Sequence, residues 1–420
     1  MTCAVRISPL ASATFAIALL CMLMAITSQP AQAQTLTVLH NFTGGADGAY
    51  PDAGLTMDGA GNLYGTTFGG GYSNSNGSVY KLAHTHGAWT FAPLHTFTGG
   101  DDGGLPYAGV VFGPDGSLYG ATTVGGAHGQ GTVFNLKPSP HFSPNLLAPW
   151  NETVLYSFQG GADGSAPYAS VTFDPAGNIY GTTYAGGSGC SGGGCGTVYR
   201  MTPSGGGHWT ENVIYSFSNS DGSIPLSSLT LDNAGNLYGT TVAGGAYGDG
   251  TVYELTYSQG TGWGQGFLHS FDANLGGEAN PYVGLILDPS GHLFGATADG
   301  EGGLFKLTRS GDSWMYSLLY GGGGGISACG ARGNLIRDGE GNLYGTTYCD
   351  GAHGDGSVFK LTPINGGWTY TTLYSFTGGS DGYWPSSNLV MDASGNLYGT
   401  SSQGGPYGNG GYGLVWEITP

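Results

Sequence analysis

Five segments of the sequence share the pattern D-G-x-x-P, which sets a carboxylate four residues before a proline: Asp47–Pro51, Asp102–Pro106, Asp163–Pro167, Asp221–Pro225 and Asp381–Pro385. A ring of such carboxylates could bind cations or polar ligands, although calcium needs several oxygen atoms converging on one point and the sequence has no compact calcium loop. Turn chemistry is the alternative, because Asp accepts hydrogen bonds from backbone amides, Gly turns the chain and Pro fixes its exit. Both interpretations remain open at this stage.

The residue after each proline, or at the equivalent place, varies more than turn chemistry requires: Asp52, Tyr107, Tyr168, Leu226, Tyr282, Arg332 and Ser386. We take Arg332, Asp52 and the three tyrosines as the best candidate ligand site. Aromatic rings stack on sugars, and polar groups accept or donate hydrogen bonds to sugar hydroxyls. Alternatively, the tyrosines pack at the mouth of a channel and Arg332 pairs with a neighbouring acid.

A second set of loops carries histidine and tyrosine at matching places, namely His128, Tyr247, His353 and Tyr407. Aromatic faces beside carboxylates and amides suit a sugar ligand. Solvent-exposed loop side chains that bind nothing explain the same pattern equally well.

All of these candidates belong to a unit that occurs seven times, each time with GNLYGTT or a close variant. The central aromatic residue of this motif falls at positions 64, 119, 180, 238, 294, 344 and 398. Such a period indicates one supersecondary unit per repeat. Each unit has four short runs rich in β-branched and aromatic residues, in the first repeat Gly54–Asp58, Asn62–Thr67, Ser78–Leu82 and Trp89–Phe97. The sequence therefore predicts an all-β fold, a seven-bladed β-propeller of four-stranded antiparallel blades.

The two ends of the repeat region predict that the ring closes. The region begins with a lone fourth strand, Leu36–Phe42, and ends after a third strand, Leu414–Thr419. Pairing of the two would give a "velcro" closure of the last blade. In such a ring the first strand of each blade lines the channel, and the variable loops share one face, which is the candidate ligand face. We also expect the tryptophans at the start of the fourth strands to pack between blades, and the glycine inside GNLYGTT to allow close approach of a neighbouring blade.

Residues 1–33 have the features of a secretory signal: Arg6, an apolar run from about Leu10 to Ile26, and an A-x-A signature at its end. We expect residues 34–420 to form one propeller domain that is secreted, periplasmic or held at the cell surface. No second apolar stretch follows, so we expect no membrane span in this part.

Four cysteines remain after residue 33: Cys190, Cys195, Cys329 and Cys349. An even number of cysteines in an exported chain predicts disulfides. A zinc site competes with this interpretation, but no histidine lies at ligand spacing. Cys329 and Cys349 fall in two loops of the same repeat, the one that lacks D-G-x-x-P, and their pairing would staple that blade.

The chain is strongly acidic, with 27 Asp and Glu residues against 9 Lys and Arg and a formal net charge of −18. Such a surface repels nucleic acid and anionic membranes and argues against a strongly anionic polymer as ligand. We expect no nucleic-acid partner, a monomer, no metal site with a recognisable motif, and no cofactor, with calcium as the one ion left open.

The repeat resembles the GloVer tandem repeat of secreted bacterial proteins. GNLYGTT and the GTVY motif that follows it carry the resemblance, which covers residues 35–420. The resemblance implies a propeller-like repeat fold and implies no activity.

Three functions fit these observations. The first is a secreted binding or scaffold propeller, whose loop-rich face recognises a neutral polysaccharide or a cell-surface partner. The second is a structural repeat protein of the envelope. The third is an enzyme acting on carbohydrate, but a glycosidase needs paired carboxylates and a lyase acting on uronic acids needs more basic residues than Arg332. Because no nucleophile elbow, HExxH, P-loop or dinucleotide motif occurs, we place binding first and enzyme last.

Overall fold

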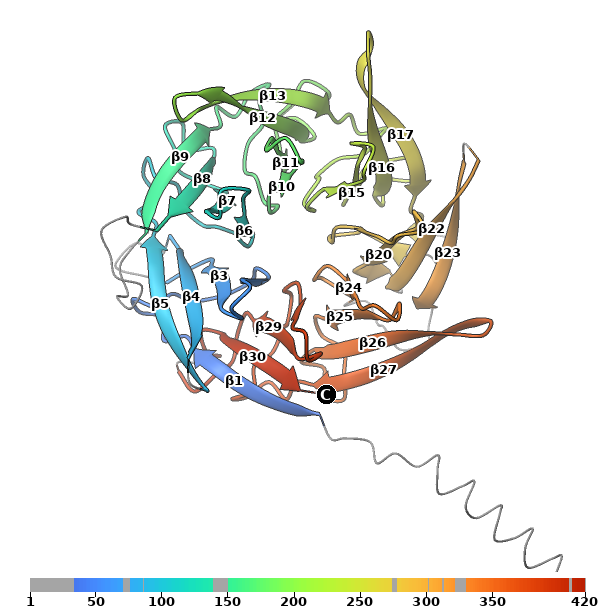
Figure 1. The fold of residues 1–420 in the computed structure, drawn as a ribbon. Helices are drawn as coiled ribbons and strands as arrows, with labels where there is room; N and C mark the ends of the chain where they lie inside the picture. Colours follow the sequence, from blue (N-terminus) through green and yellow to red (C-terminus); the bar gives the residue numbers. More distant parts are fainter. Residues whose placement is uncertain are drawn as a thin grey trace, which may run out of the picture.

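The computed structural model describes residues 34–70, 76–85, 87–138, 150–273, 278–300, 302–311, 313–321, 330–407 and 410–419. The predicted signal, residues 1–33, lies outside them. The strands form seven four-stranded antiparallel sheets arranged in a ring (Figure 1). This confirms the predicted seven-bladed β-propeller.

Six blades follow the chain from the innermost to the outermost strand. They are β2 (Thr56–Met57), β3 (Leu63–Thr67), β4 (Ser78–Thr85) and β5 (Ala88–Thr96); β6 (Val111–Phe112), β7 (Leu118–Thr122), β8 (Thr132–Lys137) and β9 (Asn151–Ser157); β10 (Thr172–Phe173), β11 (Ile179–Thr183), β12 (Thr197–Gly205) and β13 (His208–Ser216); β14 (Thr230–Leu231), β15 (Leu237–Thr241), β16 (Thr251–Ser258) and β17 (Gly262–Ser270); β19 (Ile286–Leu287), β20 (Leu293–Thr297), β22 (Gly303–Ser310) and β23 (Ser313–Gly321); β24 (Ile336–Arg337), β25 (Leu343–Thr347), β26 (Ser357–Ile364) and β27 (Gly367–Ser375). The innermost strands have only two residues, so they are shorter than the predicted runs.

Blade 7 combines both ends of the chain. Its strands are β28 (Val390–Met391), β29 (Leu397–Ser401), β30 (Leu414–Thr419) and, outermost, β1 (Thr35–Asn41). The pairing of β1 with β30 is antiparallel and runs from Thr35 opposite Thr419 to Asn41 opposite Leu414. Figure 1 shows blue β1 along the outer side of red β30. The predicted velcro closure is confirmed.

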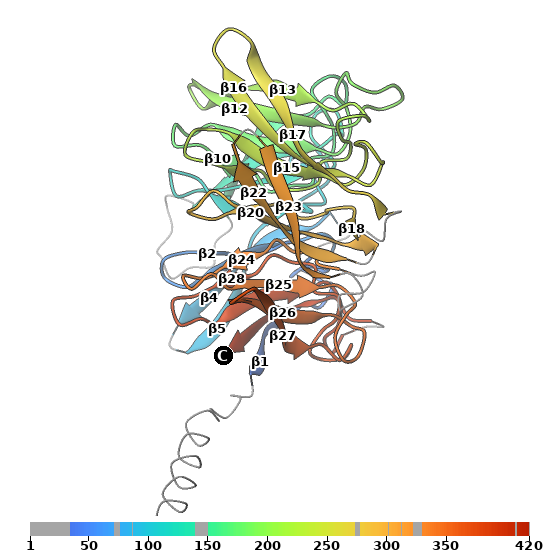
Figure 2. The same ribbon diagram turned by 90° about the vertical axis from the view of Figure 1, so that its right-hand side faces the viewer.

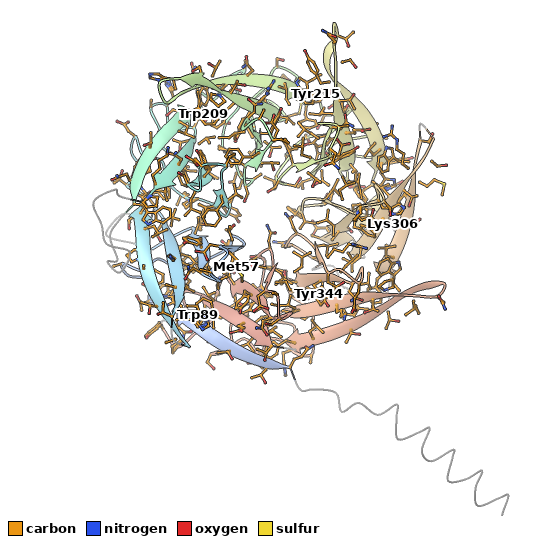
Figure 3. All side chains as sticks on the ribbon, in the orientation of Figure 1. Met57, Trp89, Trp209, Tyr215, Lys306 and Tyr344 are labelled. Carbon is orange, nitrogen blue, oxygen red and sulfur yellow. A yellow bond between two sulfur atoms is a disulfide. The ribbon has the colours of Figure 1, made fainter. Side chains whose placement is uncertain are left out.

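The hydrophobic core is divided into seven clusters, each of which joins two neighbouring blades. As predicted, tryptophans of the outermost strands pack against tyrosines of the neighbouring blade. The ring of Trp89 lies 6.0 Å from that of Tyr398, and the ring of Trp263 lies 6.2 Å from that of Tyr180. Figure 3 shows Trp89 and Trp209 near the outer rim of the ring. Side-chain packing between sheets thus joins each blade to its two neighbours.

The glycine of GNLYGTT has a different role from the predicted one. A Cβ atom on Gly65 would overlap the ring of Tyr80, and one on Gly181 would overlap the ring of Tyr199. Both rings come from the third strand of the same blade, not from a neighbouring blade. The prediction of close approach by a neighbour is therefore wrong, and the glycine makes room for a buried aromatic residue of its own sheet.

The aspartate of the D-x-x-G hairpin binds the asparagine and the tyrosine of the GNLYGTT motif that follows it. The carboxylate of Asp174 accepts hydrogen bonds from the Ala176 and Asn178 backbone N–H groups, the Asn178 side-chain amide and the Tyr180 hydroxyl, at 2.7–3.1 Å. Asp58, Asp232, Asp338 and Asp392 repeat this arrangement. Although burial alone would raise the pKa of Asp174, these donors hold it below its ordinary value. Five of the seven hairpins on this face thus share one hydrogen-bond arrangement.

The loops that precede the innermost strands and follow the second strands make up the opposite face, which we call the loop face. They pair with each other blade by blade, for example Ala49 with Gly69 and Tyr383 with Gln403. In blade 5 this pairing becomes a small sheet of β18 (Glu278–Ala279) and β21 (Asp299–Gly300). Figure 2 shows the ring edge-on, with β18 on the side away from β2 and β10.

Candidate functional site

A cavity of about 540 Å³ lies at the centre of the loop face. Its wall includes the residue after the proline, or its equivalent, from every blade: Asp52, Tyr107, Tyr168, Leu226, Tyr282, Arg332 and Ser386. The structure therefore brings together the five side chains that the sequence singles out as the best candidate site. We call this space the central cavity.

Strained turns aim these side chains at the axis. The residue before each of six prolines has a left-handed backbone, with φ between 51° and 60°: Tyr50, Leu105, Ala166, Ile224, Asn280 and Trp384. This conformation costs roughly 1–3 kcal/mol for a residue with a side chain. Two backbone hydrogen bonds hold it in blade 1, from Tyr50 N–H to Tyr412 O at 2.8 Å and from Phe68 N–H to Tyr50 O at 3.0 Å. The strain is thus stored at the rim of the central cavity.

Aromatic rings from blades 1 to 3 form one wall of the cavity. The ring of Tyr107 lies 5.1 Å from that of Phe68 and 4.9 Å from that of Tyr168, both edge to face. Tyr184 continues the row, 5.5 Å from Tyr168. Burial raises the pKa of Tyr107 to about 12, so its phenol stays protonated and able to donate a hydrogen bond.

Arg332 stands in the wall of blade 6, between two tyrosines. Its guanidinium lies 4.4 Å from the ring centre of Tyr348 and 5.3 Å from that of Tyr282. Among the described residues no carboxylate forms an ion pair with it. The alternative in which Arg332 pairs with a neighbouring acid is therefore not seen, and cation–π contacts hold the side chain instead.

Asp52 is the only carboxylate that the described part of the chain contributes to the cavity wall. Burial raises the pKa of Asp52 to about 6, and the hydroxyl groups of Ser402 and Ser386 act against this rise. The charges of Asp52 and Arg332 both act on the Tyr107 hydroxyl. The described part of the cavity wall thus combines one carboxyl group, one guanidinium cation and several phenols, with no ion pair between the two charged groups.

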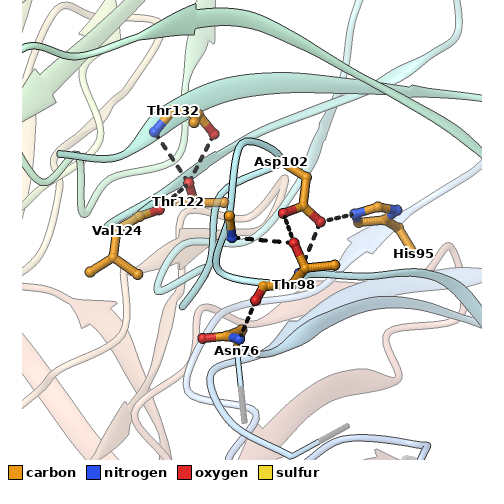
Figure 4. Close-up of polar contacts among 8 residues, drawn as sticks. Asn76, His95, Thr98, Asp102, Thr122, Val124 and Thr132 are labelled. Carbon is orange, nitrogen blue, oxygen red and sulfur yellow. Dashed lines mark hydrogen bonds and ion pairs between the residues drawn. The ribbon is translucent and has the colours of Figure 1, made fainter. Parts of the chain in front are cut away.

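The D-G-x-x-P carboxylates lie elsewhere, each bonded within its own turn. Asp102 accepts hydrogen bonds from the Thr98 backbone N–H and hydroxyl, and the His95 imidazole lies 3.4 Å from it (Figure 4). The same role is held by Asp47 with Thr43, Asp163 with Tyr156, Asp221 with Tyr215, and Asp381 with Thr377 and Tyr374. None of the five is among the residues that line the cavity. Turn chemistry accounts for the contacts seen, and a ligand role for these carboxylates stays a prediction.

The repeats of this chain match those of a known family of repeat proteins. The Gloeobacter/Verrucomicrobia repeat matches residues 23–192, 146–328 and 264–420. The chain belongs to this family. The GloVer resemblance is thereby confirmed, and the repeat accounts for the succession of equivalent blades.

Solved structures share the fold of this Gloeobacter/Verrucomicrobia repeat protein at low sequence identity. A putative 6-phosphogluconolactonase from Bacteroides uniformis is 19% identical, with 76% of this chain and 84% of that chain covered and a TM-score of 0.50. A putative oxidoreductase (glucose dehydrogenase) from Thermus thermophilus is 14% identical, with 92% and 100% covered and a TM-score of 0.43. The first of these similarities shows the fold alone. No curated protein matches the chain by sequence.

The histidines of the repeat loops lie apart from the central cavity. His128 and His353 are exposed in the loops that follow β7 and β25, and neither lines the cavity. No group of three or more His, Cys, Asp and Glu side chains in the described ranges is placed to hold a metal ion. Those ranges also contain no helix of the length and apolar character that a membrane span requires.

One of the two predicted disulfides is confirmed. Cys190 and Cys195 are bonded, with their Cα atoms 5.6 Å apart. Cys349 is also disulfide-bonded. Its predicted partner Cys329 lies outside the described residues, so that pairing stays a prediction.

The sequence analysis missed several side chains of the cavity wall. Phe68 and Tyr348 directly follow the GNLYGTT motif, and Trp384 directly precedes Pro385. Asn334 and Asn388 link blades, since Asn334 accepts a hydrogen bond from the Gly284 N–H and Asn388 one from the Asn334 N–H, both at 2.6 Å. These residues could have been found from the sequence, because the positions next to GNLYGTT and next to the proline vary while the motifs themselves do not.

Proposed function

We propose that this protein binds carbohydrate in the central cavity and acts as a binding or scaffold propeller. The observation that carries the proposal is the row of Phe68, Tyr107 and Tyr168 beside Asp52 and Gln403. Sugar rings present C–H faces that pack on aromatic rings, while their hydroxyls need hydrogen-bonding groups at the edge. The volume lies within the range of about 300–1,000 Å³ that is typical of small-ligand sites.

Binding is favoured over hydrolysis because of the number of carboxylates. Most glycoside hydrolases place two carboxyl groups on either side of the scissile bond. In the part of the chain that the structure describes, Asp52 is alone in the cavity wall. The Cys190–Cys195 disulfide supports the accompanying proposal that the protein works outside the cytoplasm.

The stacking wall is tested by removing its rings. We expect the Tyr107→Ala/Tyr168→Ala double variant to bind the carbohydrate ligand found on a glycan array about tenfold or more weakly, because two packing faces are lost. Tyr247→Ala is the matched control, since Tyr247 is 58% exposed and outside the cavity wall. A blank array, or equal losses in both variants, would contradict the proposal.

Asp52 predicts a pH dependence of the same binding. Its pKa of about 6 means that the carboxylate gains its charge as the pH rises from about 5 to about 7. A charged acceptor makes stronger hydrogen bonds to sugar hydroxyls, so affinity for a neutral sugar should rise severalfold over this interval. Asp52→Asn should remove the rise. Titration calorimetry at several pH values measures it, and an unchanged profile in Asp52→Asn would show that Asp52 does not contact the ligand.

A further inference from the structure

We propose that the sugar unit bound in the central cavity carries a carboxylate, as a uronate does, and that Arg332 recognises it. This inference rests on the proposed carbohydrate function and names the ligand class more narrowly. It begins from the placement of the basic side chains.

The basic residues of the described chain mostly have structural positions. Four of them lie 5.3–5.8 Å from the GNLYGTT-type aromatic ring of their own blade, namely Lys81, Arg200, Lys306 and Lys360. Lys137 pairs with Asp115 at 3.3 Å, and Arg309 lies over Trp314. Arg332 alone lines the central cavity.

Among the described residues, none accepts a hydrogen bond from the guanidinium of Arg332. Tyr282 and Tyr348 contact the guanidinium through their rings. The described residues provide no ion pair to the side chain, which is exposed. A guanidinium has five N–H donors in a planar fork that matches the two oxygens of a carboxylate. The tyrosines thus hold in place a cation for which the described part of the chain supplies no anionic partner.

The charge balance favours a carboxylate over a phosphate. A phosphate monoester carries roughly 1.5–2 negative charges near neutral pH, against one for a carboxylate. The ligand must enter a chain of net charge −18 and share the cavity with Asp52. Arg332 attracts one ligand charge, and each further negative charge adds repulsion from Asp52 and from the acidic surface.

The negative charge of the protein also restricts the kind of polysaccharide that can carry the uronate. A polymer with a carboxylate on every unit would be repelled by the acidic surface over its whole length. An isolated uronate, at a chain end or on a side branch of an otherwise neutral polysaccharide, avoids this repulsion. Its ring packs on the aromatic wall, its hydroxyls meet Asp52 and Ser386, and its carboxylate meets Arg332.

The test uses two oligosaccharides that differ only in the carboxylate: one that ends in a uronate, and the same compound after reduction of the carboxylate to a hydroxymethyl group. We expect titration calorimetry to show that the unmodified protein prefers the uronate form by roughly 10-fold to 100-fold. Arg332→Gln should bind both forms with the affinity that the unmodified protein shows for the neutral one. Arg332→Lys should fall between, since it keeps the charge and loses the planar fork.

Arg337→Gln is the matched control, because it removes the same charge from an exposed position outside the cavity wall. It should retain the full preference. Thermal denaturation of both Gln variants checks that they are folded. If the two oligosaccharides bind equally well to the unmodified protein, the carboxylate inference is wrong and the proposed carbohydrate function stands. If neither form binds, both fail. Tighter binding of the corresponding sugar phosphate would also overturn the choice of a carboxylate.

Discussion

Replacing Phe42 with alanine is expected to lower the free energy of unfolding by about 3–5 kcal/mol, the usual cost of emptying a buried phenylalanine site. Phe42 is 1% exposed and directly follows β1. Its ring lies 5.2 Å from that of Tyr80, and its N–H donates to Gly413 O at 3.0 Å. It thus belongs to the cluster that joins blade 7 to blade 1. Chemical denaturation followed by tryptophan fluorescence measures the loss.

Phe217→Ala is the matched control, because it removes a buried phenylalanine at a junction that does not close the ring. Phe217 is 0% exposed at the equivalent place between blades 3 and 4, so its loss of stability should be similar. Only Phe42→Ala should expose the outermost strand β1 to limited proteolysis, because β1 is joined to its blade without a covalent turn. Equal protection of β1 in the two variants would show that Phe42 does not secure the closure.

Stability is also expected to fall as the pH rises from about 5 to about 8, through Glu152 in β9 and Glu211 in β13. Burial is the main cause that raises the pKa of each from 4.5 to about 7, and Asp102 and Asp163 respectively add to it. The Oε1 atom of each is buried and has no hydrogen-bond partner among the described residues. Each carboxylate therefore becomes charged at an unfavourable place between two blades.

The sign follows from the two pKa values. Because the folded pKa lies above the unfolded one, the folded protein holds these protons more tightly. The resulting stability is fully present below about pH 4.5 and is lost as the pH rises through about 7. A rise of this size corresponds to at most about 3 kcal/mol per carboxyl, and partial exposure reduces it to about 1–2 kcal/mol.

The double variant Glu152→Gln/Glu211→Gln should therefore be more stable than the unmodified protein at pH about 8 by about 2–4 kcal/mol, and nearly equal to it at pH about 5. Denaturation at the two pH values measures both differences. Glu340→Gln, at an exposed hairpin position, is the control and should change neither. A double variant that keeps the full pH dependence would mean that other groups cause it.

The architecture could be predicted because it depends on periodic features of the chain. The spacing of the aromatic residue in GNLYGTT defines the blade, and the unmatched strand at Leu36–Phe42 defines the closure. The convergence of Asp52 and Arg332 on one cavity follows from the same periodicity, since equivalent positions of a ring face the same axis. The repeat thus predicts which positions face the axis of the ring, even where no side-chain contact can be predicted.

Contacts between strands could not be predicted in this way. Nothing in the repeat distinguishes an aromatic ring of the same blade from one of the next blade, so the neighbour of Gly65 was assigned wrongly. The partner of Asp163 is Tyr156, which comes within reach only when the turn between them folds back. Trp384 was missed because it lies before Pro385, two places ahead of the position that was compared. Such side-chain neighbours depend on turn geometry, which a sequence period does not contain.

The pairing of β1 with β30 also sets the order of events during synthesis. The first strand of the propeller leaves the ribosome long before its partner exists, and the hydroxyl of Thr419 meets the carbonyl of Thr35 across 384 positions of chain. Earlier blades can form as they emerge, but the last blade cannot be completed until β30 has been synthesised. Until then the N-terminal strand remains without its sheet.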